Sequence, residues 1–398
     1  MRAALRSQDM GVILRVYRHH PAHGPRGLPQ TEIARWLGVT QGQLSRIENG
    51  RSRVRDLDKL IKYARLLGIP EELLWFEVAD NHMEPAPSPD ALVLPNGSKI
   101  ATSVPSRILA ESLLDTLDQY VRTDMVTGPF SLLPVVGEQL RFVEGLEQAG
   151  GRADREKLRV VHARFAEFLG WLHQDTGNLR AADKWTASAW AIACETEDFR
   201  LHSYIRSRQS NIAADRGRPK ATIDLAESAL DQATALSPRL RAVALRQLAH
   251  GYAQLGRARE CDVALRQATD QSATAAADDN DLARYCTPEF IAMEAADCWI
   301  DLGRPHHAIA ALEQSLPCWL PQNRRDLGRG LSLLALAYAR TGQPDQALAT
   351  ARHALMIVLQ THSTRTEREL YRVIRELRTS GSEHHATELR SALHAILS

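Results

Sequence analysis

The stretch VTQGQLSRIENG, Val39 to Gly50, gathers side chains that can hydrogen-bond to DNA bases. A glutamine amide pairs with adenine through one donor and one acceptor, and an arginine guanidinium pairs with guanine through two donors. Arginines follow at positions 51, 53 and 55, and guanidinium groups also bind phosphate. These residue types at this spacing predict a surface that contacts nucleic acid.

Local signals predict that this stretch is a short helix with one polar face. Thr40 is a preferred N-cap residue and Gln43 follows it by three positions, which is the spacing of a capping box. Leu44 and Ile47 recur at helical spacing, so we expect both to face a core. The positions left on the outer surface are Gln41, Gly42, Gln43, Ser45 and Arg46.

The elements that must position this helix form a compact run within residues 9–77. Apolar periodicity predicts five helices there, in the segments MGVILRVY, LPQTEIARWLG, VTQGQLSRIENG, LDKLIKYARLLG and PEELLWF. Gly38, Gly50 and Gly68 close three of these segments, at positions where a left-handed C-terminal cap favours glycine. Pro29 and Pro70 stand at helix starts, where the missing N–H costs little.

Charge is unevenly distributed along the 398 residues, although the formal net charge is only +1. Residues 1–70 carry 13 Lys and Arg against 5 Asp and Glu, so their balance is +8 and that of the remaining residues is −7. A basic N-terminal part on an acidic body indicates that only this part meets a polyanion.

Several functional classes lack support. No run of about 18 apolar residues exists, so no membrane-spanning helix is expected, and the apolar run at the N-terminus is too short for a signal peptide. The five cysteines are scattered without CxxC spacing, which argues against a disulfide framework or a zinc site and favours a reducing cytoplasm. No GxGxxG, P-loop, GxSxG or HExxH pattern occurs, so we expect no catalytic residue, no metal and no cofactor.

The chain changes character after the basic part. Residues 80–106 contain five prolines without sustained periodicity and are interpreted as a linker. The predicted organisation is a DNA-binding domain at 1–79, a proline-rich linker at 80–106 and a helical body at 107–398, with clear repeats from about 158.

Six helix pairs are predicted in the body by a recurring glycine followed by a small residue. The glycines are at 177, 217, 256, 303, 342 and 381, and five positions after them come Ala182, Thr222, Cys261, Ala308, Ala347 and Ala386. Glycine permits a tight turn between two helices, and the small residue lets the second helix pack closely on the first. The pattern resembles the tetratricopeptide repeat, with loops slightly longer than in the usual unit of about 34 residues. That resemblance implies an α-solenoid whose first helices line a concave groove.

Alignment of the repeats on their turn glycines predicts which side chains line this groove. They are Arg164, Glu167, Trp171, Tyr204, Arg208, Asn211, Arg246, His250, Met293 and Asp297. Arg208, Asn211 and Arg246 have the donors to hold a peptide backbone or a carboxylate. For any single residue of the set, an ordinary contact between repeats is the alternative.

The basic part resembles the Xre-type family of helix-turn-helix regulators, which includes the lambdoid phage repressors. The resemblance covers about residues 9–77 and rests on Gln30, the Ile33-Ala34 pair, Gly38, Val39, the Thr-Gln pair and the sequence Ile-Glu-Asn-Gly. It implies a recognition helix in the major groove, with base contacts from Gln41, Gln43, Ser45 and Arg46. The phosphate contacts it implies, extended by proximity along the basic strip, are Gln30, Thr40, Asn49, Arg51, Arg53 and Arg55. It also implies a partly buried Arg18–Glu48 pair, and Gly42 departs from the glutamine that the phage proteins often carry.

The two resemblances together imply an all-α chain in which a five-helix, lambda-repressor-like domain precedes a tetratricopeptide-type α-solenoid. This combination resembles the peptide-responsive quorum-sensing regulators of Gram-positive bacteria, and more closely the Xre-plus-repeat regulators of actinomycetes. It implies a cytoplasmic, homodimeric transcriptional regulator that binds a palindromic operator in double-stranded DNA. Its repeats would sense a peptide, small molecule or partner protein. The alternative is an adaptor that does not bind DNA and that sequesters or scaffolds another regulator.

Overall fold

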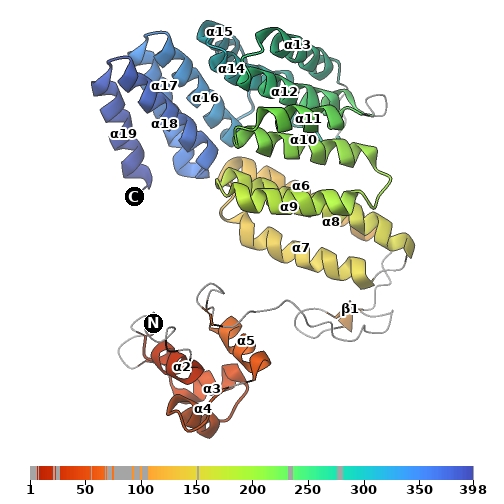
Figure 1. Cartoon of the computed structure of the whole chain (residues 1–398), viewed down its shortest axis with the longest axis vertical. Coiled ribbons are helices and arrows are strands. Elements are labelled where there is room, and N and C mark those ends of the chain that lie inside the picture. Colours follow the sequence, from red (N-terminus) through yellow and green to blue (C-terminus); the bar gives the residue numbers. More distant parts are fainter. Residues whose placement is uncertain are drawn as a thin grey trace. The chain divides into compact units, whose positions relative to one another are not determined.

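The computed structural model describes residues 7, 9–20, 23, 27–54, 56–67, 69, 74–75, 92–93, 99–100, 106–149, 152–231, 236–275 and 281–397. The chain divides into two compact units, Met1–Pro87 and Ser88–Ser398, which are both drawn in Figure 1. We call the first unit the head and the second the repeat unit, and describe each by itself. The limits of the linker at 80–106 stay a prediction.

Four helices of the head are described, namely α2 (Met10–Arg18), α3 (Gln30–Leu37), α4 (Gln41–Glu48) and α5 (Leu57–Leu66). Their apolar faces enclose one core, which includes Leu44 and Ile47 of α4 and so confirms the orientation predicted for that helix. The helix predicted in PEELLWF lies outside the described residues, apart from Leu74 and Trp75, and neither of these is helical.

Two close backbone arrangements fix the position of α4. Gly38 ends α3 with a φ of 69°, a left-handed conformation that favours glycine, and this confirms the predicted cap. Gly11 of α2 has no room for a Cβ atom, because the carbonyl oxygen of Ile47 lies against it. The two glycines therefore allow α4 to follow α3 in a tight turn and to lie close beneath α2.

The repeat unit begins with a small antiparallel pairing of β1 (Leu92–Val93) with β2 (Lys99–Ile100), inside the segment predicted as linker. Helices α6 (Ser106–Thr127) and α7 (Leu132–Ala149) follow it. Six consecutive helix pairs come next: α8 (Arg152–Asp175) with α9 (Leu179–Ala193), α10 (Phe199–Asp215) with α11 (Pro219–Ala229), α12 (Pro238–Gln254) with α13 (Ala258–Thr274), α14 (Pro288–Asp301) with α15 (Pro305–Ser315), α16 (Arg324–Arg340) with α17 (Pro344–Thr361), and α18 (Thr364–Thr379) with α19 (Glu383–Leu397). A short 3-10 helix, η4 (Leu316–Cys318), connects α15 to α16.

Every pair turns at the glycine that the sequence predicts. The six turn glycines have φ values between 64° and 82°, where a residue with a side chain is strained. The six small residues that follow them are all fully buried, at 0% exposure. Both parts of the repeat signature are therefore confirmed.

Successive pairs stack through their first helices, as the consecutive colours of Figure 1 show. Helix α10 contacts α12, α12 contacts α14, and α16 contacts α18. One core runs through this stack from Ala110 of α6 to Leu393 of α19. The prediction of an all-α chain that ends in a helical solenoid is confirmed.

The solenoid also closes on itself. Helix α6 contacts α8 of the first pair and, in addition, α16 and α17 of the fifth pair. Gly128, directly after α6, has no room for a Cβ because the Thr361 carbonyl lies against it. Asp175, at the end of α8, accepts a 2.8 Å hydrogen bond from the Ser363 hydroxyl, just before α18. We call these contacts of α6, α8 and α10 with α16, α17 and α18 the closure.

Candidate nucleic-acid interface and inner face of the repeats

Helix α4 presents polar side chains to solvent, as predicted. Gln41, Gln43 and Arg46 are exposed and Ser45 is half-buried. The Thr40 hydroxyl accepts a 3.2 Å hydrogen bond from the Gln43 backbone N–H, and the Gln43 side-chain oxygen accepts one of 2.8 Å from the Thr40 N–H. This confirms the capping box and occupies the Gln43 carbonyl oxygen, so that side chain can offer a base only its amide N–H groups.

A chain of hydrogen bonds orients the first residue of α4. Arg18 donates to both carboxylate oxygens of Glu48, each over 3.0 Å, which confirms the pair implied by the family resemblance. Gln30 donates to Glu48 over 2.7 Å, and Gln41 donates to the Gln30 side-chain oxygen over 3.0 Å. Because Glu48 is only 6% exposed, the chain starts in the core and ends on the exposed Gln41 amide. One N–H of the Gln41 amide is used in the hydrogen bond to Gln30, and the amide oxygen and the second N–H remain available.

The residues predicted to contact phosphate surround α4. Those exposed to solvent are Thr40, Asn49, Arg51 and Arg53. Gln30 is half-buried, and the Arg53 guanidinium lies 3.5 Å from the Asp9 carboxylate, which partly neutralises it. Arg55 lies outside the described residues. The contacts of all these residues with DNA stay predictions.

The inner face of the repeat unit is more closed than the predicted groove. Arg164 and Trp171 are half-buried, whereas the residues at 9% exposure or less are Glu167, Tyr204, Arg208, Asn211, Arg246, His250, Met293 and Asp297. Met293 is fully buried in the main core, so the prediction that it lines an accessible groove is wrong. Residues that line a groove and residues that form a core recur at the same helical spacing. The spacing therefore does not show whether an inward-facing side chain is accessible. A ligand-binding role for the other residues stays a prediction.

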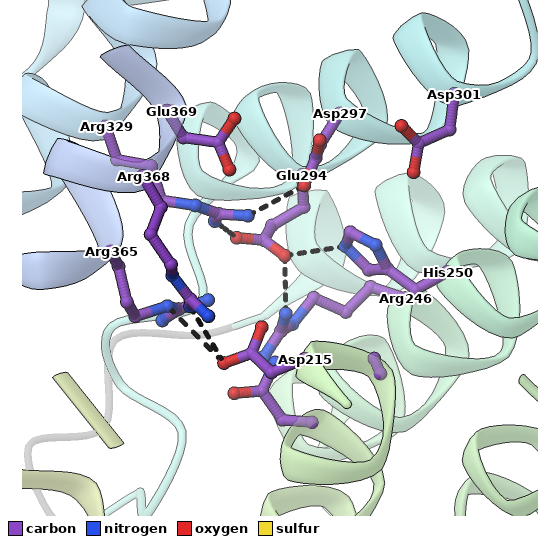
Figure 2. Close-up of polar contacts among 12 residues, drawn as sticks. Asp215, Arg246, His250, Glu294, Asp297, Asp301, Arg329, Arg365, Arg368 and Glu369 are labelled. Carbon is purple, nitrogen blue, oxygen red and sulfur yellow. Dashed lines mark hydrogen bonds and ion pairs between the residues drawn. The ribbon is translucent and has the colours of Figure 1, made fainter. Parts of the chain in front are cut away.

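Glu294 of α14 is the centre of one buried ion-pair cluster, shown in Figure 2. Its carboxylate accepts hydrogen bonds from Arg246 over 2.5 Å and from His250 over 2.8 Å, and it pairs with Arg329 of α16. Burial alone would raise the pKa of Glu294, but the two arginines and His250 outweigh it and hold that pKa well below its usual range. Arg329 also donates to Asp297 over 3.0 Å, so the cluster links α12, α14 and α16.

A second cluster surrounds Trp171 of α8. Three guanidinium groups lie 4.7, 4.5 and 5.3 Å from the centre of its ring, those of Arg208, Arg325 and Arg365. Arg208 donates to Glu167 and to the Gln174 side-chain oxygen, each over 2.7 Å. Asp124 of α6 accepts a 2.9 Å hydrogen bond from the Trp171 indole and pairs with Arg325. Cation–π and ionic contacts thus hold α6, α8, α10 and α16 together.

Asp215 joins this cluster to the last helix pair. Arg365 and Arg368 of α18 each approach the same Asp215 oxygen, Oδ2, to 3.8 Å (Figure 2). Gln174 donates to that oxygen over 2.7 Å. Burial would raise the pKa of Asp215, but Arg365, Gln174 and Arg368 together hold it below its usual value.

Several of these central residues are absent from the predicted groove set, above all Glu294, Arg329 and Asp215. Glu294 could have been found, because it precedes Gly303 by as many positions as Arg208 precedes Gly217. Arg329 and Asp215 carry no such local signal, since their partners lie in other repeats.

Asp175→Asn is expected to stabilise the repeat unit at neutral pH. Burial raises the pKa of Asp175 from 3.8 to about 6, against the opposing effects of Arg365 and the Ser363 hydrogen bond. The ionised carboxylate is therefore disfavoured in the folded state, so its contribution to stability falls as the pH rises from about 4 through 6. Asparagine keeps an acceptor for Ser363 without the charge and should add about 1–3 kcal/mol at pH 8. Urea unfolding of both proteins at pH 8 and pH 5 checks this, because the gain must shrink at pH 5.

A cavity of about 460 Å³ lies at the ends of the inner helices. It is lined by Gly217, Pro219, Ala253, Gln254, Asp301 and Arg340. Asp301 accepts a 2.9 Å hydrogen bond from Arg372, and Arg340 pairs with Glu376 at 3.2 Å. Its volume falls within the range of about 300–1,000 Å³ that small-molecule sites occupy.

These features define a helix-turn-helix domain followed by a tetratricopeptide-like solenoid. Residues 9–75 match the family model of a helix-turn-helix domain. No curated protein matches the chain. In the described parts of the chain, no helix has both the length and the apolar character that crossing a membrane requires.

Three solved structures illustrate what the chain is similar to. A Rap protein complexed with competence and sporulation factor is 14% identical, with 74% of this chain and 88% of that chain covered and a TM-score of 0.49. BtubC from P. vanneervenii is 18% identical, with 58% and 91% covered and a TM-score of 0.41. A putative kinesin light chain from Podosopora anserina, with nearly identical TPR-like repeats, is 19% identical, with 49% and 93% covered and a TM-score of 0.34.

Proposed function

We propose that the chain is a sequence-specific transcriptional regulator whose head reads DNA and whose repeat unit receives a signal. The observation that supports this most is the hydrogen-bonded chain from Arg18 through Glu48 and Gln30 to Gln41. It orients an exposed amide at the start of an exposed polar helix, and a preorganised group loses less entropy when it binds. In helix-turn-helix domains, this end of the second helix meets the base edges in the major groove.

In this proposal, α4 lies in the major groove with Gln41, Ser45 and Arg46 on base edges, and Gln43 contributes through its amide N–H groups. Thr40, Asn49 and the arginines after Gly50 then lie beside the phosphates, together with Gln30. A Cβ placed at Gly42 would meet no atom within 4 Å, so this position faces open space. In this proposal Gly42 makes no side-chain contact with the bases, and Gln41, Gln43, Ser45 and Arg46 supply all the contacts from α4.

One head offers a small interface, so we propose that two chains bind together. Two heads would occupy the half-sites of a palindromic operator about one helical turn apart, with the repeat units supplying the dimer contact. The repeat unit would receive a peptide, a small molecule or a partner protein, in the cytoplasm. The cavity beside Asp301 supports this role, because polar side chains line a space of the size that small-molecule sites occupy. Such a combination of domains is typical of regulators and adaptors rather than of enzymes.

Selection of binding sites from random duplex DNA, with and without extract of the producing cell, tests the proposal directly. Recovery of a palindromic consensus supports it, and a change of affinity with extract supports a soluble signal. No enrichment by the purified full-length chain, at low salt and in either condition, would count against DNA reading. That outcome favours the adaptor, for which the exposed Trp36 and Val12 of the head, each at 40% exposure, would be docking residues.

Arg46→Ala is expected to weaken binding to the selected operator by about 1–3 kcal/mol and to relax the preference at one base pair. The reason is that Arg46 is an exposed guanidinium in the last turn of α4, where it can donate two hydrogen bonds to guanine. Titration of labelled operator and random duplex at one fixed salt concentration measures both effects.

The matched control is Arg51→Ala, which removes an exposed arginine just after the helix. It should weaken binding to operator and to random duplex by similar factors. The slope of the logarithm of the binding constant against the logarithm of the salt concentration should fall by about one, for one counterion fewer released. Equal losses on operator and random duplex for Arg46→Ala would refute base reading by that residue.

A further inference from the structure

The closure contains an arginine that is mostly shielded from solvent and whose ion-pair contact is long. Arg365 of α18 has a side chain that is only 12% exposed, and it donates no hydrogen bond to any described residue. Its nearest ionic partner, Asp215 Oδ2, is 3.8 Å away, beyond the 2.7–3.2 Å or so of a hydrogen bond. A guanidinium carries five N–H donors, so Arg365 has donors that no described residue engages.

Asp215 accepts no close hydrogen bond from Arg365 or Arg368. Arg368 approaches the same oxygen of Asp215, also to 3.8 Å, so two guanidinium groups share one carboxylate oxygen. That oxygen already accepts a hydrogen bond of 2.7 Å from Gln174. Arg365 and Arg368 therefore keep donors that Asp215 does not engage, and the other carboxyl group facing Arg365 nearby is that of Asp175.

The other arginines of this region are already engaged. Arg208 donates to Glu167 and Gln174, and Arg325 pairs with Asp124. Arg365 lies with them over the Trp171 ring, which forms an apolar wall on one side. Arg365 also stands in the first turn of α18, where the helix dipole adds positive partial charge. Arg368 is 43% exposed at its side chain, so solvent reaches the pair from that side.

We propose that Arg365 and Arg368 form a binding site for an oxyanion, a carboxylate or phosphate group carried by the ligand of the repeat unit. The oxyanion supplies the acceptors that Asp215 does not provide, with Trp171 beside it. This assignment rests on the proposed function and gives the chemical class of its ligand. Because the site lies between the last helix pair and the first two, its occupation tightens the closure.

The carboxylates around the site make binding depend on pH. Asp175, Asp215 and Asp326 face Arg365 or one another from α8, α10 and α16, and they repel an incoming anion. One oxygen of Asp175, Oδ2, is buried without a hydrogen-bond partner. Protonation of this carboxyl removes a negative charge and creates a donor, so we expect tighter binding at pH 6 than at pH 8. Sulfate is a suitable probe, because its charge stays constant over this range.

The test uses the full-length chain and calorimetric titration with sodium sulfate, at constant ionic strength maintained with chloride. Sulfate is expected to bind and to raise the unfolding temperature of the repeat unit relative to chloride. Arg365→Gln and Arg368→Gln should each weaken binding by at least about tenfold, since each removes one of two charged partners. Arg375→Gln, an exposed arginine on the same helix, is the matched control and should bind as the unaltered protein does. Sulfate binding that is equal in all four proteins, or absent from the unaltered one, would overturn the proposal.

A second set of titrations identifies the source of the oxyanion. Inorganic phosphate and O-phosphoserine represent phosphorylated ligands, and an acetylated tripeptide with a free C-terminal carboxylate represents peptides and organic acids. The amide of the same tripeptide should not compete with sulfate. Circular dichroism verifies that each variant is folded, and the half-exposed position of Arg368 keeps the test usable if Arg365→Gln unfolds.

The same proteins report separately on the proposed function. Selective operator binding without sulfate binding would overturn the anion site and leave the regulator in place. Sulfate binding that depends on Arg365 and Arg368, in a chain that selects no DNA sequence, would support the site and overturn the regulator.

Discussion

Glu294→Ala is expected to destabilise the repeat unit by about 3–5 kcal/mol, because the change leaves buried positive charges without their partner. Glu294 is 2% exposed and accepts from Arg246, His250 and Arg329, which belong to two other helix pairs. Arg246 and Arg329 are themselves at most 8% exposed. Neither side chain can turn to solvent without opening the stack of α12, α14 and α16.

Urea unfolding, followed by circular dichroism, measures this effect. Glu227→Ala, on the exposed face of α11, is the matched control and should change stability by less than about 0.5 kcal/mol. The loss of stability for Glu294→Gln should lie between those of the two alanine variants, since glutamine preserves the size and one acceptor but not the charge. A loss below about 1 kcal/mol for Glu294→Ala would show that the surrounding arginines find other partners, and would contradict the central position given to Glu294.

Arg18→Ala is expected to abolish specific DNA binding by unfolding the head, although Arg18 is not placed at the DNA. The Glu48 carboxylate, 6% exposed, would keep only the hydrogen bond from Gln30. Breaking a buried pair on one side costs about 3–5 kcal/mol, which is comparable to the whole stability of a small domain. Arg18 also donates to the Leu28 carbonyl over 3.2 Å, so the segment before α3 loses an anchor as well.

Two measurements separate this effect from a lost DNA contact. Proteolysis should cut the head of Arg18→Ala rapidly while the repeat unit stays resistant, and operator binding should fall together with the folded fraction. Arg15→Ala removes an exposed arginine from the same helix and should leave both properties unchanged. A fully folded head that still fails to bind DNA would place Arg18 in the interface rather than in the core.

Features encoded over a few residues were predictable from the sequence. The turn glycines, the small residues after them and the Thr40–Gln43 capping box all depend on neighbours within one helical turn. The resemblance of the head to a known family supplied the Arg18–Glu48 pair, whose members are too far apart for periodicity to connect.

The inner face was harder to predict, because its contacts connect residues in different repeats. Asp215 and Arg365 meet across the closure, and Asp124 meets Arg325 from a helix that precedes the repeats. Periodicity places each of these side chains on an inward face but does not show which partner arrives there. For the same reason, periodicity does not show that the charges of this face are buried and paired with one another, or that Met293 lies in the core.

The closure changes how this solenoid responds to denaturation. In an open array of repeats, each unit touches only its neighbours, so the two ends can fray independently of the middle. Here the hydroxyl of Ser363 binds Asp175, and the Thr361 carbonyl lies against Gly128. Both terminal repeats are therefore stabilised by contacts with the opposite end of the array as well as by their neighbours. Loss of the first pair removes contacts from the last one, and stepwise melting gives way to a single cooperative transition.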